Sequence, residues 1–279
     1  MSTTIITEHP GWHTTPDDEP VRVVEFQGAA WLAHWESERE HLLLRALDPA
    51  AADQPPVAYT SAVELPTAAE GTLLLDELVS LGTVARLTNP SLWDAITTAL
   101  LRQVISAPQA RKKHRAFYSA YGRAFDTPAG PLPLTPAPEV VLEVSDEGFT
   151  AIGAKFNAKG LRSAATAYLD RGEHWATLDP ESLVKELCEV TYIGPWTAAA
   201  AAADFTGDHS VYPHGDLAVR TWAGRAAPGL TLPGDEKHFE ALWRQWAPTR
   251  SQLHALTLFT LTWGSHARVT RAGGTPHHP

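Results

Sequence analysis

The chain has 279 residues, 44% of them hydrophobic, and a formal net charge of −10 at pH 7. This length allows one large domain or two modest ones, with enough apolar side chains for a sizeable core. No apolar run reaches the roughly 18 residues of a membrane-spanning helix, and the N-terminus lacks the basic start and apolar middle of a signal peptide, so we expect a cytoplasmic protein without membrane contacts.

The negative charge is concentrated near the N-terminus. Residues 1–85 carry a net charge of −11, whereas residues 86–279 carry +1. A protein that holds DNA phosphates needs local positive charge, so the neutral second part permits DNA binding through a local patch. Cys188 is the only cysteine, which excludes a disulfide framework and a cysteine-based metal cluster.

The N-terminal part predicts a flexible arm followed by a small α/β subdomain. Residues 1–20 are polar and contain proline, which is typical of a loose arm. The β-branched run from Val21 to Gln27 predicts a strand, and residues 38–47 fit either a strand or a helix. Further apolar runs follow a proline-rich loop, so we predict a small α/β subdomain over residues 21–85.

From residue 86 to residue 271 the pattern predicts a helical domain. Ser91 is placed to cap a first helix that includes Val104, and Pro108 to begin a second. Residues 126–138 contain five prolines and predict a surface linker. Later helices are expected over 236–245 and 251–263, and the composition of residues 272–279 predicts a disordered tail.

From Glu181 onward we expect a helix, a tight turn and a second helix that opens at Trp196 and runs through the alanine block. Asp179 is a suitable N-cap for the first helix, with Pro180 at its first position. In the turn at residues 191–195, Gly194 can adopt a positive φ and Pro195 can begin the alanine-rich second helix. Asp216 then opens a third helix.

This stretch resembles the helix-hairpin-helix and Gly/Pro-Asp (HhH-GPD) module of base-excision DNA glycosylases, above all the AlkA-type 3-methyladenine DNA glycosylases. The residues that carry the resemblance are 193–198 and 211–220. Residues 100–110 are similar to the family's early pocket helix, and residues 246–251 to its closing segment. The likeness spans residues 80–268 and implies a mostly α, HhH-GPD helical domain with a small N-terminal α/β subdomain.

The resemblance also implies a function. It is the hydrolysis of the N-glycosidic bond of alkylated or damaged purines in double-stranded DNA, with the damaged base flipped out and the protein acting as a monomer. No cofactor is required, although the hairpin carbonyls can hold a monovalent cation. The lysine of the strand-cleaving relatives is absent, because Trp196 occupies its position, so we expect no lyase activity.

Asp216 is the candidate catalytic residue. A carboxylate beneath the sugar can stabilise the oxocarbenium-like centre, and the N-terminus of a helix favours its ionised form. The alternative is that Asp216 only caps its helix. The register is also open: counting from Trp196 places Asp216 at the family's aspartate, whereas counting from Leu217 as a helix anchor places Gly215 there.

The remaining site residues follow from the resemblance. The candidates for the base pocket are Trp196, Gln103, Tyr212, His214 and Trp222. The candidates for contacts with the DNA backbone are Thr191, Tyr192, Gly194, Thr197, Arg250 and Ser251. The family pattern Gly-x-Gly is broken by Tyr192, which can block a phosphate or donate to it. Tyr192 and Gly215 therefore leave a second hypothesis, a glycosylase fold that binds lesions without excision or acts on a nucleoside or another small molecule.

Overall fold

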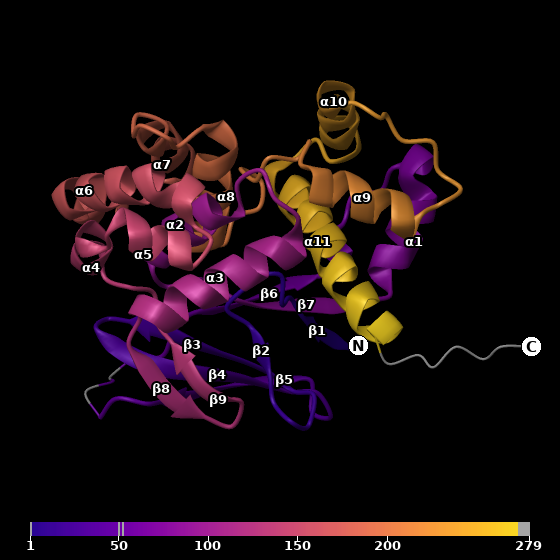
Figure 1. Cartoon of the computed structure of the whole chain (residues 1–279). Helices are drawn as coiled ribbons and strands as arrows, with labels where there is room; N and C mark the ends of the chain where they lie inside the picture. The colour runs from indigo at the N-terminus through magenta and orange to yellow at the C-terminus, as the bar shows by residue number, and fades with distance from the viewer. Residues whose placement is uncertain (1, 50, 52, 273–279) are drawn as a thin grey trace, which may run out of the picture. The chain divides into compact units, whose positions relative to one another are not determined.

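The computed structural model describes residues 2–49, 51 and 53–272, with side chains up to residue 265 (Figure 1). The chain forms two compact units. Unit 1 contains Met1–Glu8, Ala58–Arg86 and Pro213–Pro279, and unit 2 contains His9–Val57 and Leu87–Tyr212. Each unit therefore combines N-terminal residues with residues of the helical part, a division that differs from the predicted boundaries at residues 20, 85 and 271.

Unit 2 contains a four-stranded antiparallel sheet in the order β2-β3-β4-β5. The strands are β2 (His13–Thr14), β3 (Pro20–Phe26), β4 (Ala29–Glu36) and β5 (His41–Ala46). The strand predicted from Val21 is confirmed as β3, and residues 38–47 resolve in favour of a strand. β5 pairs with β4 from Trp31↔Ala46 to Glu36↔His41.

A second hairpin packs on this sheet. Strands β8 (Ala124–Thr127) and β9 (Gly130–Pro133) pair with each other, and Leu132 and Leu134 join the buried cluster of the larger sheet. The cluster also contains Val21, Val23, Ala30 and Leu32. The prediction of a surface linker is therefore wrong for residues 126–134, because Leu132 and Leu134 are buried against the sheet despite the prolines around them.

The prediction of a flexible arm over residues 1–20 is also wrong. Strand β1 (Thr3–Ile5) pairs in parallel with β7 (Thr83–Leu87), and β6 (Val57–Ser61) completes a three-stranded sheet in the order β1-β7-β6. Ile5 is 2% exposed, and His9 of unit 2 is also buried. Because the segment is polar overall, its composition did not indicate that these few side chains are buried.

The helices of unit 2 follow the predicted order. They are α2 (Leu92–Arg102), α3 (Ala107–Tyr121), α4 (Pro138–Glu143), α5 (Asp146–Ala151), α6 (Ala158–Trp175), α7 (Pro180–Leu187) and α8 (Pro195–Thr206), with the short 3-10 helix η3 (Lys155–Asn157) before α6. Ser91 and Asp179 cap α2 and α7 as predicted. α8 buries its alanines against α2, since small side chains allow close approach of two helices.

Unit 1 contains α1 (Thr72–Val79), α9 (Leu217–Ala226), α10 (Glu236–Trp246) and α11 (Arg250–Ala272), with the 3-10 helices η1 (Ala62–Glu64) and η2 (Ala69–Gly71). α11 continues past the predicted end at residue 263 to Ala272, the first residue of the predicted tail, and the rest of that tail lies outside the described residues. Among the described residues, no helix combines the length and apolarity needed to cross a membrane.

The packing of α9 on α11 depends on Gly264. A Cβ added at Gly264 would lie 2.3 Å from the ring of Trp222, closer than any real contact. Gly264→Ala should therefore destabilise the protein by about 1–3 kcal/mol through overpacking. Gly224→Ala is the matched control in α9, where a Cβ meets nothing within 4 Å, and it should stabilise by about 0.5–1 kcal/mol. Urea unfolding measures both, and equal effects would contradict this packing.

Candidate functional site

The hairpin turn differs in detail from the prediction. The positive φ expected at Gly194 occurs instead at Tyr192, whose φ is +75°. Gly194 has extended backbone with φ −85° and ψ 173° because it is the N-cap of α8, a position that requires this conformation. Ile193 between them is 4% exposed, so burial of this side chain fixes the shape of the turn.

Gln103 holds the turn in place. It lies directly after α2, and its Nε2 donates to Thr197 Oγ1 at 2.7 Å and to the Tyr192 carbonyl at 3.2 Å. The predicted pocket glutamine is thus bonded to two of the predicted backbone-contact residues, and Thr197 is 2% exposed. On the other side of α2, Asn157 Nδ2 donates to the Leu100 carbonyl at 2.7 Å. The end of α2, the end of η3 and the hairpin turn are therefore tied together.

Each of these three segments exposes a large apolar side chain. Val104 is 91% exposed, Phe156 is 75% exposed and Tyr192 is 54% exposed. Val104 was expected inside a helix, but α2 ends at Arg102 and Val104 has a φ of +57°. The break arises because Ser106 and Gln109 form a capping box that begins α3. That capping pattern was the sequence signal that could have revealed the exposed turn.

The other predicted residues of unit 2 occupy different environments. Trp196 is half-buried at the start of α8, and the Arg102 guanidinium carbon lies 5.9 Å from its ring centre. Thr191 is exposed in the hairpin turn. Tyr212 is 4% exposed and stacks on His209 with 6.0 Å between ring centres. Trp196 is therefore the more accessible of the two aromatic pocket candidates in this unit.

In unit 1, Asp216 is the N-cap of α9. Its carboxylate accepts from the Ala218 amide at 3.0 Å, and its side chain is half-buried. The neighbouring Gly215 has no room for a side chain, because a Cβ there would lie 2.3 Å from Glu236 Cγ. Leu217, the alternative helix anchor, is 67% exposed. The structure therefore has space for a carboxylate at residue 216, whereas a side chain at residue 215 would collide with the start of α10.

The remaining predicted residues of unit 1 are mostly structural. His214 is 1% exposed, with Nδ1 at 3.2 Å from Thr257 Oγ1, and Trp222 is 8% exposed against α11. Both therefore belong to the packed interior of this unit. Arg250 is exposed at the start of α11, and Ser251 Oγ donates to Glu64 at 3.4 Å.

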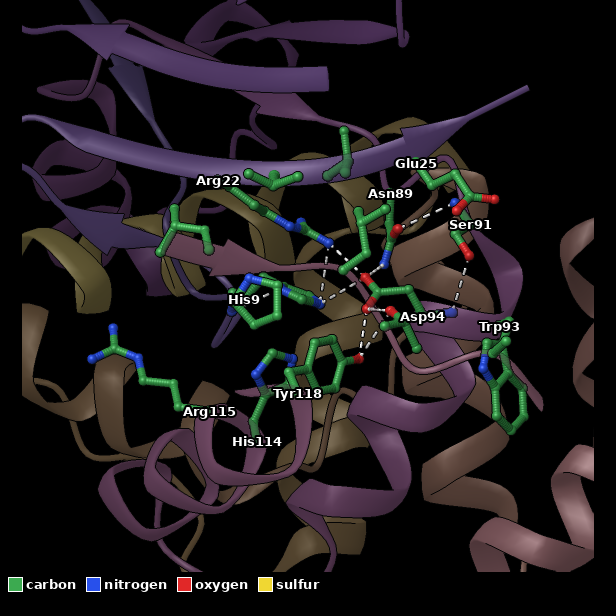
Figure 2. A pocket seen from close by; sticks show the side chains of 18 of the residues that line it. His9, Arg22, Glu25, Asn89, Ser91, Trp93, Asp94, His114, Arg115 and Tyr118 are labelled. Carbon is green, nitrogen blue, oxygen red and sulfur yellow. Dashed lines mark hydrogen bonds and ion pairs between the residues drawn. The ribbon is translucent and has the colours of Figure 1, made fainter. Parts of the chain in front are cut away.

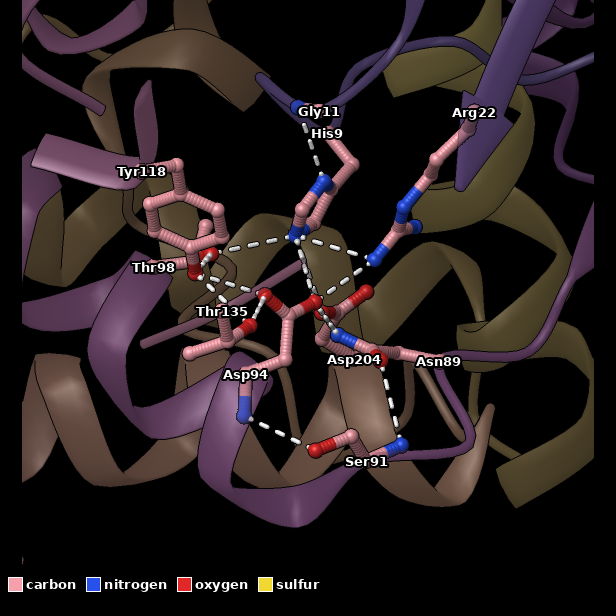
Figure 3. A network of polar contacts seen from close by, with 10 residues as sticks. All are labelled: His9, Gly11, Arg22, Asn89, Ser91, Asp94, Thr98, Tyr118, Thr135 and Asp204. Atoms are coloured by element: carbon pink, nitrogen blue, oxygen red, sulfur yellow. Dashed lines mark hydrogen bonds and ion pairs between the residues drawn. The ribbon is translucent and has the colours of Figure 1, made fainter. Parts of the chain in front are cut away.

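Sequence reasoning missed a buried polar network in unit 2 (Figure 3). At its centre is Asp94 of α2. The carboxylate accepts from Arg22 Nη2 at 2.7 Å, from Asn89 Nδ2 at 2.8 Å and from the Tyr118 hydroxyl at 2.6 Å. It also accepts from Thr135 Oγ1. Residues that lie far apart in the chain therefore converge on one carboxylate, a pattern that no local motif reveals.

Two histidines adjoin the network. Burial, followed by the charge of Arg22, lowers the pKa of His9. Burial, followed by the charge of His9, lowers the pKa of His114 well below its usual range. Burial alone would raise the pKa of Asp94, but the interactions with His9 and Arg22 outweigh it and hold that pKa well below its usual value. The interior therefore contains an ionised carboxylate beside neutral histidines.

The three side chains His9, Asp94 and His114 lie close enough to be considered as metal ligands, with one ligand atom of each within 4.8 Å of the others. The hydrogen bonds argue against such a site. His9 Nδ1 accepts from the Gly11 amide at 3.0 Å, and its Nε2 lies 3.3 Å from Arg22 Nη2, whose positive charge occupies the place of a metal ion. Asp94 already accepts from an arginine, whose charge would repel a cation.

The neutral buried histidines predict acid sensitivity. In the unfolded chain His9 and His114 take up protons below about pH 6.5, whereas the folded state resists protonation. The free energy of unfolding should therefore fall by about 1.4 kcal/mol per pH unit for each of them as the pH drops below 6.5. Asp94 adds a further decrease in the free energy of unfolding towards pH 4 and below. Its pKa is lower in the folded than in the unfolded chain, so its ionised form stabilises the folded state only at higher pH.

Urea unfolding between pH 8 and pH 4 tests this prediction. His114→Gln should reduce the slope of stability against pH, whereas His174→Gln, which changes an exposed histidine of α6, should leave the slope unchanged. A slope in His114→Gln equal to that of the wild type would show that His114 is not held neutral.

Comparisons with known proteins identify the fold. No family model matches the sequence, and no curated protein sequence matches it. Solved structures do match. The 8-oxoguanine glycosylase/lyase of Clostridium acetobutylicum, in complex with double-stranded DNA containing cytosine opposite 8-oxoguanine, is 15% identical, with a TM-score of 0.66 over 95% of this chain and 90% of that chain.

Two further structures agree with this match. The 3-methyladenine DNA glycosylase from Archaeoglobus fulgidus is 18% identical, with a TM-score of 0.66 over 92% of this chain and 91% of that one. MBOgg1 in complex with a low-affinity DNA ligand is 13% identical, with a TM-score of 0.64 over 94% of this chain and 90% of that one. The chain therefore has the fold of the helix-hairpin-helix DNA glycosylases, as its sequence resemblance indicated.

Proposed function

We propose that this protein is a monofunctional DNA glycosylase that removes alkylated or otherwise damaged purines from double-stranded DNA. The observation that carries the proposal is the position of Asp216 as a half-buried carboxylate at the start of a helix within this fold. The carboxylate accepts from the Ala218 amide, and a carboxylate at such a position can orient water or stabilise positive charge on the sugar.

Unit 2 supplies a surface suited to the DNA backbone. Helices α3, α6 and α8 begin at the three segments tied together by Gln103 and Asn157, and helix N-termini present amide groups to phosphates. Lys155 and Lys159 are exposed in the same stretch. Thr191, Tyr192 and Gly194 are exposed in the hairpin turn and are available for such contacts.

Thr197 and the hairpin carbonyls have other roles in this proposal. Thr197 positions the turn through Gln103 rather than meeting DNA itself. A monovalent cation at the hairpin would bind the turn carbonyls, and that of Tyr192 keeps one lone pair beside its bond to Gln103. Arg250 in unit 1 contributes an exposed cation at a helix start.

The exposed turn at Val104 is suited to opening a base stack. Proteins that bend DNA insert apolar side chains between base pairs, and Val104 offers an apolar side chain on a turn held by Gln103. A β-branched residue at positive φ is strained, so the turn retains valine at a cost in stability. Trp196 is then the candidate surface on which a flipped base stacks.

The catalytic role of Asp216 is tested by Asp216→Asn. The substitution keeps an N-cap but removes the charge, so release of 3-methyladenine from alkylated duplex DNA should fall by about a hundredfold or more without loss of stability. Asp235→Asn is the matched control, because Asp235 caps α10 in the same way. Single-turnover assays of base release measure the effect.

The outcomes of this assay separate the hypotheses. Base release that is equally fast in Asp216→Asn would contradict the catalytic role. Tight binding of abasic DNA by the wild type without release of any base would favour the lesion-binding alternative, for which Tyr192 at the hairpin is the structural argument.

Val104→Gly should change stability and DNA affinity in opposite directions. Glycine relieves the positive φ, which should stabilise the protein by about 1 kcal/mol. The same substitution removes the apolar side chain, so affinity for a duplex with an abasic site should weaken severalfold. Val63→Gly, which removes an exposed valine of unit 1, should not weaken DNA binding. Unchanged affinity in Val104→Gly, measured by fluorescence anisotropy, would exclude the insertion.

A further inference from the structure

Phe156 is exposed on a turn that is otherwise well packed. It lies in η3 and is 75% exposed, whereas Ala154, Asn157 and Ala158 around it are 0%, 3% and 5% exposed. A phenylalanine left in water forgoes the stabilisation that burial would bring. Its exposure does not come from a loosely packed segment, because its neighbours on both sides are anchored in the interior. The fold therefore holds this aromatic ring outward at a defined position.

The Asn157 side chain fixes that position. Its Nδ2 donates to the Leu100 carbonyl at 2.7 Å, and its Oδ1 accepts from Lys113 Nζ at 2.8 Å. Asn157 is also the N-cap of α6, yet its side chain makes no capping hydrogen bond. An N-cap asparagine ordinarily accepts from an amide of the first helical turn. Here the side chain instead joins η3 to α2 and α3, so Phe156 is positioned by the helices around it.

Phe156 belongs to the same surface as Val104 and the hairpin turn. A Cβ added at Gly160, in the first turn of α6, would lie 3.3 Å from Leu100 Cδ2 and 3.3 Å from Tyr192 Cβ. The segment that carries Phe156 is thus packed against the end of α2 and against the hairpin. Val104 follows four residues after Leu100. Two exposed apolar side chains, one aliphatic and one aromatic, therefore stand on neighbouring turns.

The charges around Phe156 indicate a nucleic acid as its partner. Lys155 and Lys159 flank it and are exposed, and the sequence contains no acidic residue between Glu147 and Asp170. Lysines bind the phosphates of a DNA strand, and aromatic rings between such cations stack on its bases. A base–aromatic stack needs no hydrogen bonds from the side chain, and phenylalanine offers none. The ring is therefore suited to contact with the face of a base.

We propose that Phe156 stacks on the base opposite the damaged one once the damaged base has left the duplex, an inference that rests on the proposed glycosylase function. That opposite base has lost its pairing partner, so it is the base that a ring can separate from its neighbours at the lowest cost. Val104, which is small and aliphatic, enters the stack beside it. Because Phe156 cannot read hydrogen-bonding groups, the preference it confers follows the stacking strength of the opposite base and is larger for a purine than for a pyrimidine.

The test compares the affinity of the full-length protein for two duplexes that differ only opposite an abasic site. One duplex carries adenine there, and the other carries a second abasic site, which leaves no base for a ring to stack on. Fluorescence anisotropy gives the ratio of the two affinities. This ratio should be about tenfold larger in the wild type than in Phe156→Ala, since base–aromatic stacking contributes about that factor. The comparison between variants removes the effect of the different flexibility of the two duplexes.

Leu169→Ala is the matched control, because it removes another exposed apolar side chain, 48% exposed, from α6 of the same unit. It should keep the wild-type ratio, and Phe156→Trp should restore it through its larger ring. Equal ratios in the wild type and Phe156→Ala would overturn the proposal. Base release from alkylated DNA is scored separately. A ratio that depends on Phe156 without base release contradicts only the proposed catalysis, whereas base release with a ratio independent of Phe156 contradicts only the stacking.

Discussion

The interior of unit 2 depends on the Asp94 carboxylate. A buried charge is tolerated only when it is paired and hydrogen-bonded, and loss of one partner from such a group costs about 3–5 kcal/mol. Asp94 meets this requirement with donors from the segment before α2, from β3, from α3 and from the loop before α4. One buried charge therefore connects β3, α2, α3 and the loop before α4.

That constraint determines what lies around it. His114 has to sit beside Tyr118, and burial next to Arg22 and His9 keeps its ring neutral. A cavity beside the network is lined both by residues of the network and by residues of β3 (Figure 2).

The surface proposed for DNA has a different origin. Short polar contacts join three chain segments, and each segment exposes an apolar side chain that a free monomer has no reason to expose. Val104 and Tyr192 both adopt positive φ there. Strained backbone in non-glycine residues is retained where the surrounding structure or the function requires it, and these two residues meet that description at adjacent, hydrogen-bonded turns.

The helical part of this protein was predictable from its amino-acid sequence. Caps such as Ser91 and Asp179, the proline at the start of α8 and the alanine run after it are local signals, and local signals are readable without a partner. The order of its motifs was sufficient to identify the glycosylase fold, and Asp216 appeared as a helix cap in the expected place. These features depend on residues within a few positions of one another.

The other features depend on contacts that form only when the chain folds. The N-terminal strand, the β8-β9 hairpin and the burial of His9 depend on surfaces contributed by distant residues, which composition does not encode. The absence of room for a side chain at Gly215 depends on contact with Glu236 from another helix. The convergence of four side chains from positions 22 to 135 on Asp94 could not be predicted for the same reason. Hydrogen bonds between residues far apart in the chain produce no periodic pattern in the sequence.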